Sequence, residues 1–314
     1  MGKTSTKFNS LALLVLGVMS VSTGAILIRL AMTEAKPLVI AAYRLIFSSL
    51  LSILIVLITR PKPALKLTRS MIGLMGLSGF FLAIHFASWI SSLELTNVSS
   101  SVVVVSTTPL WVALLSPIFL KEKVKPRFYF GMLLAFLGGG IIAFNERCTL
   151  SVAGLQCGAE FGMRQNNSVL GLVLALVGAV MAAGYMLIGR KLSGKIDTAR
   201  YTAIVYSVAA VILLFVVIFR GEQLVNYSVR IWGLFFALAI FPQLLGHSVL
   251  NYSLQRLPAT TVSIALLGEP VGSTLLAMLF LNEMPSTLQL IGGILILIGI
   301  VYSVLPTKSK LNGV

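Results

Sequence analysis

The chain has 314 residues, of which 57% are hydrophobic and only 11% are charged, and its mean hydropathy is +0.99. A soluble domain of this length carries more charge, so the composition excludes the soluble classes and indicates a membrane protein with several spanning helices. The net charge of +15 would suggest a nucleic-acid partner in a soluble protein, but here the basic residues lie in short segments between apolar runs, which is a signal of membrane topology.

Ten apolar runs, each long enough to cross a bilayer, follow one another along the chain. We expect membrane helices at residues 10–32, 37–59, 70–93, 96–119, 126–145, 168–190, 197–219, 231–254, 258–281 and 286–305. Lys3 and Lys7 give the first run the appearance of a signal peptide. Its apolar stretch is too long for one and another run follows at once, so we expect it to remain as a helix.

The distribution of basic residues predicts the orientation of these helices. With the N-terminus inside, seventeen of the 24 Lys and Arg residues fall in inner segments and six in outer segments, while Arg44 lies within a helix. This bias predicts that both termini are cytoplasmic. We expect the chain to lie in the inner (plasma) membrane. The loop 146–167 would then face outward, where Cys148 and Cys157 either form a disulfide in an oxidising compartment or remain free thiols.

The second half of the chain repeats the first at a constant offset of 161 residues. Pro109 and Glu122 recur as Pro270 and Glu283, and each pair is 13 residues apart. The same register pairs Gly17 with Gly178, Arg29 with Arg190, Leu120 with Leu281, Gly131 with Gly292, and Gly138 with Gly299. Each copy holds five helices, an odd number, so the second copy must enter the membrane in the opposite sense. We therefore expect two inverted repeats, 1–145 and 168–314, the second ending in a short cytoplasmic tail, joined by the outer loop; this organisation is typical of alternating-access transporters.

These features resemble the EamA-type, ten-helix branch of the drug/metabolite transporter superfamily. The matching residues are the Tyr43-Arg44 pair in the second helix, the Pro and later Leu-x-Glu that end helices four and nine, and the Gly that opens each following helix. The resemblance implies an all-α bundle of two inverted five-helix repeats and the export of metabolites such as amino acids. Two positions depart from the symmetric pattern: Lys121 replaces the family's usual small residue before the Glu, and Thr108 stands opposite Glu269.

Glu269 is the acidic residue that lies deep within a predicted helix, near the middle of 258–281. A charged carboxylate at that depth costs roughly 2.5–3.5 kcal/mol on insertion scales, and intramembrane acids are functional candidates by default. The next residue, Pro270, frees the carbonyl of Leu266 from its helical bond. We expect Glu269 to bind a proton or the ammonium group of a substrate; the alternative is a paired or neutral Glu that fixes helix packing.

Polar residues at helical spacing also mark three other predicted helices. In 37–59, Arg44 begins a line with Ser48 and Ser52, for which we favour a structural role. The other two lines hold both histidines of the chain: Gln243, His247 and Asn251 in 231–254, and His85, Ser88, Trp89 and Ser92 in 70–93. Residues at this spacing share one helix face. We expect both lines to face a central cavity, with either histidine contacting substrate or relaying protons; the alternative is ordinary hydrogen bonding between helices.

Aromatic residues and prolines complete the candidate site. Trp89, Trp111, Tyr43 and Tyr185 lie away from the expected membrane interfaces and would suit a pocket for an amino acid or a drug-like amphiphile, or they simply pack in the bundle. The prolines at 109, 242 and 270 are candidate hinges, because a proline removes a backbone donor and weakens a helix locally.

The predicted function is a secondary transporter that exports small metabolites, with a small-molecule substrate, the lipid bilayer and candidate coupling protons as partners. The sequence shows no nucleotide-binding or metal-site motif and no catalytic constellation, so we expect no cofactor, no metal and no enzymatic activity. Two alternatives keep the fold: a flippase for a lipid-linked intermediate and a facilitator without proton coupling. A membrane enzyme or a non-transporting scaffold fits the sequence less well, and the oligomeric state stays open.

Overall fold

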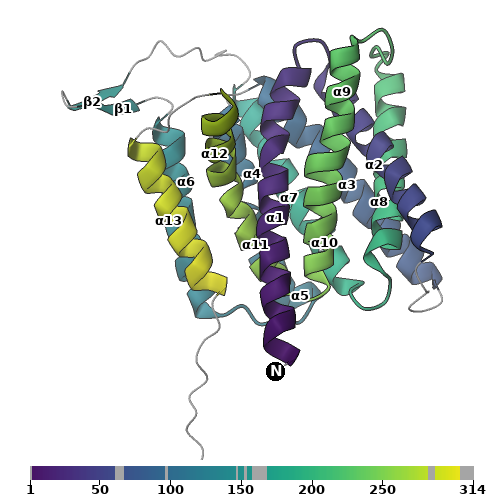
Figure 1. Cartoon of the computed structure of the whole chain (residues 1–314), viewed down its shortest axis with the longest axis horizontal. Coiled ribbons are helices and arrows are strands. Elements are labelled where there is room, and N and C mark those ends of the chain that lie inside the picture. Colours follow the sequence, from purple (N-terminus) through teal and green to yellow (C-terminus); the bar gives the residue numbers. More distant parts are fainter. Residues whose placement is uncertain are drawn as a thin grey trace, which may run out of the picture.

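The computed structural model describes residues 2–60, 67–95, 98–145, 148–151, 154–157, 168–281 and 287–304. Figure 1 shows these residues as a bundle of helices standing side by side, with a short β-hairpin at one edge. Within the described residues, six helical segments are long and apolar enough to cross a membrane. Of the other four predicted spans, 96–119 and 258–281 contain an interrupted helix. The remaining two, 126–145 and 286–305, form the helices α6 and α13, and each includes terminal residues whose side chains or backbone the structure does not describe. The all-helical membrane fold predicted from the sequence is confirmed.

The helices of the first half follow the predicted spans closely. They are α1 (Gly2–Ala31), α2 (Pro37–Thr59), α3 (Arg69–Leu95), α4 (Val98–Val105), α5 (Thr108–Phe119) and α6 (Pro126–Asn145). The helix α1 begins at Gly2, before the predicted span at residue 10, so its first turns are formed by the polar N-terminal residues. The predicted fourth span is split into α4 and α5, since Pro109 at the start of α5 cannot donate a helical hydrogen bond to the turn before it.

The second half shows two interrupted spans. Its elements are α7 (Ser168–Lys191), α8 (Thr198–Phe219), α9 (Val229–Leu238), the π-helical segment η1 (Ala239–His247), α10 (Ser248–Leu254), α11 (Ala259–Ala265), the 3₁₀ turn η2 (Leu266–Gly268), α12 (Glu269–Leu281) and α13 (Thr287–Val304). Pro242 lies inside η1, where the missing donor favours the wider π winding. Pro270 is the second residue of α12, which begins directly after η2. Two of the three predicted hinge prolines thus lie within or beside a change of helix type, and the third, Pro109, lies beside a break.

A short antiparallel hairpin lies in the loop between the halves. Strand β1 (Cys148–Ser151) pairs with β2 (Gly154–Cys157), and the register places Cys148 opposite Cys157. The side chains of both cysteines lie outside the described part of the structure, so their disulfide stays a prediction. The hairpin itself has no counterpart among the sequence predictions, since its strands are only four residues long.

Each main contact between a helix of the first half and a helix of the second half has a counterpart in which the two halves exchange roles. The helix α3 packs on α7, and the segment α9–η1–α10 packs on α1 in the corresponding way. Likewise α4 and α5 contact α7, while α11 and α12 contact α1. Two further pairs, α2 with α8 and α6 with α13, join helices that occupy equivalent places in the halves. Two copies of one five-helix unit related by a two-fold axis would produce this pattern.

The contact between α6 and α13 shows the exchange at single residues. A Cβ atom added at Gly131 would lie 2.4 Å from the carbonyl oxygen of Gly299, and one added at Gly138 would lie 2.4 Å from that of Gly292. The sequence offset pairs Gly131 with Gly292 and Gly138 with Gly299. Gly131 therefore contacts Gly299, the counterpart of Gly138, and Gly138 contacts Gly292, the counterpart of Gly131. Glycine is required here because the two backbones approach too closely for any side chain.

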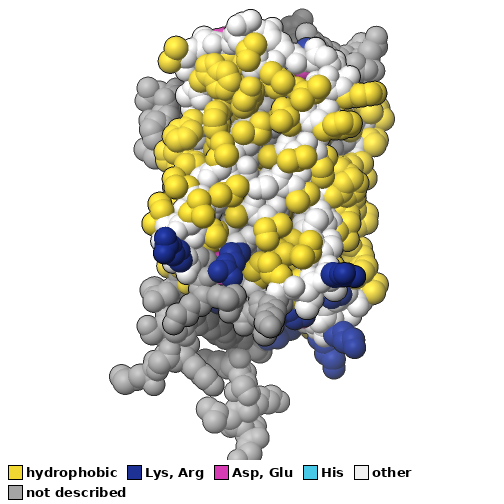
Figure 2. Space-filling view, turned by 90° about the vertical axis from the view of Figure 1, so that its right-hand side faces the viewer, with side chains coloured by type: hydrophobic (Ala, Val, Ile, Leu, Met, Phe, Trp, Pro, Cys, Tyr) yellow, Lys and Arg dark blue, Asp and Glu magenta, His cyan; other side chains and the backbone are white. Residues whose placement is uncertain are grey.

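The outer surface carries the apolar side chains that a bilayer requires. Large exposed hydrophobic residues occur on almost every helix, among them Leu57, Ile118, Phe215 and Val301. Figure 2 shows hydrophobic side chains spread over most of the height of the face in view. The Lys and Arg side chains visible in that view gather mainly at its lower end, which is the end where the N-terminus lies in Figure 1.

Candidate functional site

A cavity lies at the centre of the bundle and receives side chains from both halves. Its volume, counted as the space that the centres of water molecules can occupy, is about 70 Å³. This is room for several water molecules. The first half contributes, among others, Arg44 from α2, His85 and Trp89 from α3, and Thr108 and Pro109 from α5. The second half contributes Tyr185 and Met186 from α7, His247 and Asn251 from the α9–η1–α10 segment, and Glu269 from α12.

Helix interruptions from both halves meet at this cavity. Val105, Ser106 and Thr108 surround the break between α4 and α5, and all three line the cavity. Leu266 and Leu267 of η2 line it from the other half. The offset of 161 residues superimposes 106–107 on 267–268, so the two interruptions occupy corresponding positions. Discontinuous helices at equivalent places in two repeats are typical of the binding site in transporters.

Glu269 is the first residue of α12 and lines the cavity half-buried. The dipole of a helix favours negative charge at its N-terminus. The backbone carbonyl of Glu269 accepts hydrogen bonds from the hydroxyls of Ser273, at 2.9 Å, and Ser22, at 3.2 Å. Among the described residues, no group donates a hydrogen bond to its carboxylate, and no basic nitrogen lies within 4.0 Å of it. The carboxylate therefore points into the cavity without a direct partner.

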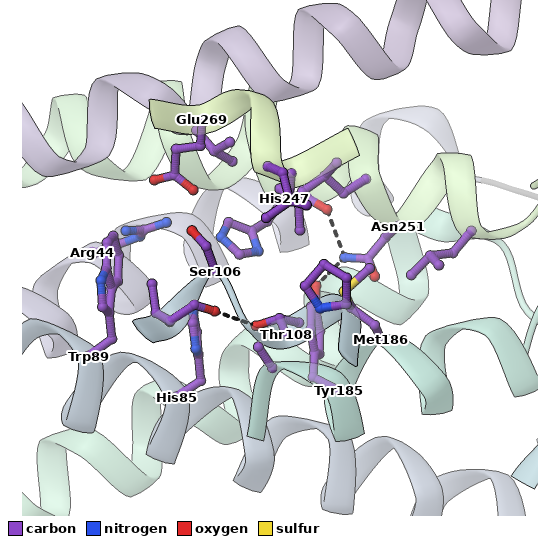
Figure 3. Close-up of a pocket in the computed structure, with 18 residues that line it drawn as sticks. Arg44, His85, Trp89, Ser106, Thr108, Tyr185, Met186, His247, Asn251 and Glu269 are labelled. Atoms are coloured by element: carbon purple, nitrogen blue, oxygen red, sulfur yellow. Dashed lines mark hydrogen bonds between the residues drawn. The ribbon is translucent and has the colours of Figure 1, made fainter. Parts of the chain in front are cut away.

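Arg44 faces Glu269 from the opposite wall, as Figure 3 shows. Its side chain is only 1% exposed, so it does not extend outward to the membrane surface. The Nε atom donates a hydrogen bond of 2.8 Å to Oε1 of Gln243, and the guanidinium carbon lies 4.0 Å from the centre of the Phe86 ring. The Nη1 atom has no hydrogen-bond partner in the described structure. Gln243 thus does not line the cavity itself but holds a residue that does.

The two histidines lie close together in the cavity wall. The ring centres of His85 and His247 are 6.3 Å apart. The Nδ1 of His85 lies 2.9 Å from the carbonyl oxygen of Gly178, which can only accept, so Nδ1 carries the proton and Nε2 is left as an acceptor. The amide of Asn251 donates to the hydroxyl of Tyr185 and, at 2.9 Å, to the carbonyl of His247. These contacts link the histidines to the end of the cavity opposite Arg44.

Several predicted site residues lie outside the cavity. The ring of Tyr43 packs among Phe47, Trp232 and Phe235, and its hydroxyl donates to the carbonyl of Leu224 at 2.5 Å. Trp111 and the hinge candidates Pro242 and Pro270 are likewise absent from the cavity lining. Of the four aromatic residues considered for a pocket, Trp89 and Tyr185 line the cavity, whereas Tyr43 and Trp111 do not.

Some lining residues were not predicted from the sequence. Ser106, Thr108 and Met186 contribute to the wall. Thr108 carries a usable signal, since the repeat places it opposite Glu269, and the structure brings both to the same cavity. Ser106 lies two residues earlier, in the break between α4 and α5, and the repeat pairs it with Leu267 of η2, which also lines the cavity. Among the described residues, no group of three or more His, Cys, Asp and Glu side chains forms a metal site.

A partly buried ion pair lies directly beyond one end of the cavity. Nε of Arg190 lies 2.6 Å from Oε1 of Glu122, and Nη1 of Arg190 donates to the carbonyl of Leu254 at 2.9 Å. The other oxygen of Glu122 accepts from the backbone N–H of Ala259, at 3.4 Å. The side chain of Leu254 lines the cavity. Glu122 of the first half is thus linked to α7 through Arg190, to α10 through the hydrogen bond of Arg190 to Leu254, and to α11 through Ala259.

Comparison with known proteins gives a consistent result. The sequence pattern of the EamA-like transporter family matches residues 9–144 and again residues 169–305. An uncharacterized transporter of Archaeoglobus fulgidus is 24% identical over 88% of this chain and 90% of its own length. The pseudopaline exporter CntI of Pseudomonas aeruginosa is 23% identical over 84% of this chain and 86% of its own. A solved crystal structure with 20% identity superimposes with a TM-score of 0.75 over 94% of this chain and 96% of the other.

Proposed function

Because the chain belongs to the EamA-like transporter family, we propose that it is a secondary transporter that exports small metabolites, such as amino acids or related amphiphiles. The observation that carries the proposal is the central cavity, in which Arg44, His85, His247 and Glu269 converge inside an otherwise apolar bundle. Charged and polar groups are costly in a membrane and are typical of substrate and ion pathways. The direction of transport rests on the family resemblance, and one relative is named as an exporter.

Alternating access between two inverted repeats is the mechanism that fits this cavity. The exchange of packing partners between the halves supports the repeats, and the contact between α6 and α13 supports an axis between them. The ion pair between Glu122 and Arg190 supports a conformation closed at one end, since it ties the two halves together next to Leu254. Transport would require this pair to separate when the cavity opens at that end.

The charge distribution supports both termini on the cytoplasmic side of an inner (plasma) membrane. The inner segments of the predicted topology hold most of the basic residues, and Figure 2 shows Lys and Arg gathered near the end with the N-terminus. Cytoplasmic loops of membrane proteins carry such an excess. Reporter fusions after residues 60 and 221 should report opposite sides of the membrane, the first cytoplasmic and the second external.

Glu269 is the residue we propose for proton coupling, because its carboxylate lies in the cavity without a direct partner. A facilitator without coupling remains the alternative, since a single acid in the wall is enough to bind substrate without binding a transported proton. A flippase for a lipid-linked intermediate would need several basic groups to bind a phosphate. Among the described lining residues, Arg44 is the only basic residue of the Lys or Arg type, so this alternative has less support.

Metabolite profiling tests the proposed function. Media of cells that express the wild type, Glu269→Gln or Glu94→Gln at equal levels are compared. Glu94 is an exposed acid near the end of α3 and serves as the matched control. We expect a few small metabolites to accumulate with the wild type and the control and to fall to background with Glu269→Gln. Equal accumulation with all three would remove Glu269 from the pathway, and no accumulation with the wild type would contradict export.

A further inference from the structure

Two groups of opposite charge, the buried Arg44 and the half-buried Glu269, face one another across the cavity with no direct contact. Arg44 comes from the first half and Glu269 from the second, and no acidic oxygen of the described residues lies within 4.0 Å of the guanidinium. A buried charge without an ionic partner is unfavourable. Arg44 has only the neutral amide of Gln243 and the face of Phe86. Each charge is thus available to a ligand that enters between them.

The end of the cavity near Arg44 offers unused hydrogen-bond donors. Nη1 of Arg44 and Nε1 of Trp89 are both buried, and neither has a partner in the described structure. The two residues are 1% and 5% exposed, and both line the cavity. Both lie near Phe86, whose ring centre is 4.0 Å from the guanidinium carbon of Arg44 and 6.5 Å from the ring centre of Trp89. A guanidinium and an indole N–H are donors only, so their natural ligand is an anionic oxygen. A carboxylate fits the planar guanidinium especially well.

Gln243 fixes the direction in which Arg44 presents these donors. Its side-chain oxygen accepts from Nε, while the ring of Phe86 covers one face of the guanidinium. Arg44 itself lines the cavity, and its Nη1 keeps no hydrogen-bond partner in the described structure. Gln243 is fully buried and does not line the cavity, so it acts as a positioning residue for the anion subsite.

We infer that the cavity binds a zwitterion, with its carboxylate on Arg44 and Trp89 and its ammonium group on Glu269. This inference rests on the proposed transport function and assigns the two charged subsites within it, with the ammonium group of the substrate on Glu269 in place of the coupling proton. A zwitterion supplies a partner of the right sign to each wall. A ligand with only a carboxylate leaves Glu269 without a partner, and one with only an amine leaves Arg44 without a partner, so each binds more weakly.

A binding experiment with three matched compounds tests the assignment. Valine, isobutylamine and isovalerate share the same branched four-carbon unit and carry both charged groups, only the ammonium group, or only the carboxylate. Purified protein in detergent is titrated with each compound, and the shift of its thermal unfolding gives the apparent dissociation constant. We expect the wild type to bind valine most tightly. Removing one partner of a buried charge pair weakens binding roughly 30-fold or more.

The variants should change the preference in opposite directions. Arg44→Met should lose valine binding and favour isobutylamine, whereas Glu269→Gln should favour isovalerate. Gln243→Leu should weaken valine and isovalerate but not isobutylamine, a selective loss that a general folding defect would not produce. Arg44→Lys should retain part of the valine binding and so exclude a misfolded site as the cause.

Two results would overturn the inference. One is a wild type that binds isobutylamine or isovalerate as tightly as valine, or binds none of the three. The other is valine binding that survives Arg44→Met or Glu269→Gln unchanged. Either result leaves the proposed transport function standing if the wild type still exports metabolites in the profiling experiment, whereas absent export would contradict that function separately.

Discussion

The close contact between α6 and α13 predicts opposite effects of two neighbouring substitutions. An added Cβ at Gly138 would lie 2.4 Å from the carbonyl oxygen of Gly292 and 2.9 Å from a side-chain carbon of Ile296, whereas an added Cβ at Gly139 meets nothing within 4 Å. Gly138→Ala must therefore push the helices apart, and such overpacking costs about 1–3 kcal/mol. Gly139→Ala should gain up to about 1 kcal/mol from the higher helix propensity of alanine.

Thermal unfolding of both purified variants in the same detergent measures this difference. Because both substitutions replace glycine by alanine in the same turn of α6, their intrinsic helix propensities cancel in the comparison. We expect the melting temperature of Gly138→Ala to fall below that of the wild type and that of Gly139→Ala to stay level or rise. Equal melting temperatures for the two variants would refute the close approach of α6 and α13, and with it the structural support for the two-fold axis.

Further predictions concern the ion pair at the end of the cavity, the aromatic cluster and the positioning of Arg44. Glu122→Gln should raise exposure of the cavity at that end about fivefold, since the pair with Arg190 is about three-quarters buried and contributes about 1 kcal/mol after solvent screening. Thiol labelling of an introduced cysteine measures this exposure, and unchanged labelling would contradict the prediction. Tyr43→Phe should lower the melting temperature by removing the hydrogen bond to Leu224 while leaving the export rate per folded molecule intact; a lost rate at full stability would return Tyr43 to the site. Gln243→Leu should reduce export although the side chain lies outside the cavity, and wild-type export would show that Arg44 needs no positioning.

Hydropathy was sufficient to predict where the membrane helices lie. Most predicted spans agree with the helices to within two residues, since the length of an apolar run sets the length of the helix that spans a bilayer. The helix interruptions could be predicted only in part from the sequence. Prolines at 109, 242 and 270 marked the three affected spans, but a proline does not reveal whether a helix breaks, tightens to a 3₁₀ turn or widens to a π-helix.

The candidate site could be predicted only in part, because helical spacing identifies a face but not its neighbour. Gln243, His247 and Asn251 were expected on one cavity face, yet the π-helical winding of η1 turns Gln243 toward Arg44 and leaves the other two in the cavity wall. Tyr43 precedes Arg44 directly, so it lies on a different face of α2 and packs against α9 instead. Only the arrangement of the helices decides such cases.

Accessibility of the cavity from both sides of the membrane tests the central claim most directly. Ala182 lines the cavity and is small enough to replace by cysteine. In a background in which both native cysteines are replaced by serine, Ala182→Cys is treated with a membrane-impermeant thiol reagent in right-side-out and in inside-out vesicles. Alternating access predicts labelling in both preparations and protection by a transported substrate. Labelling from one side only, with and without substrate, would contradict alternating access through this cavity.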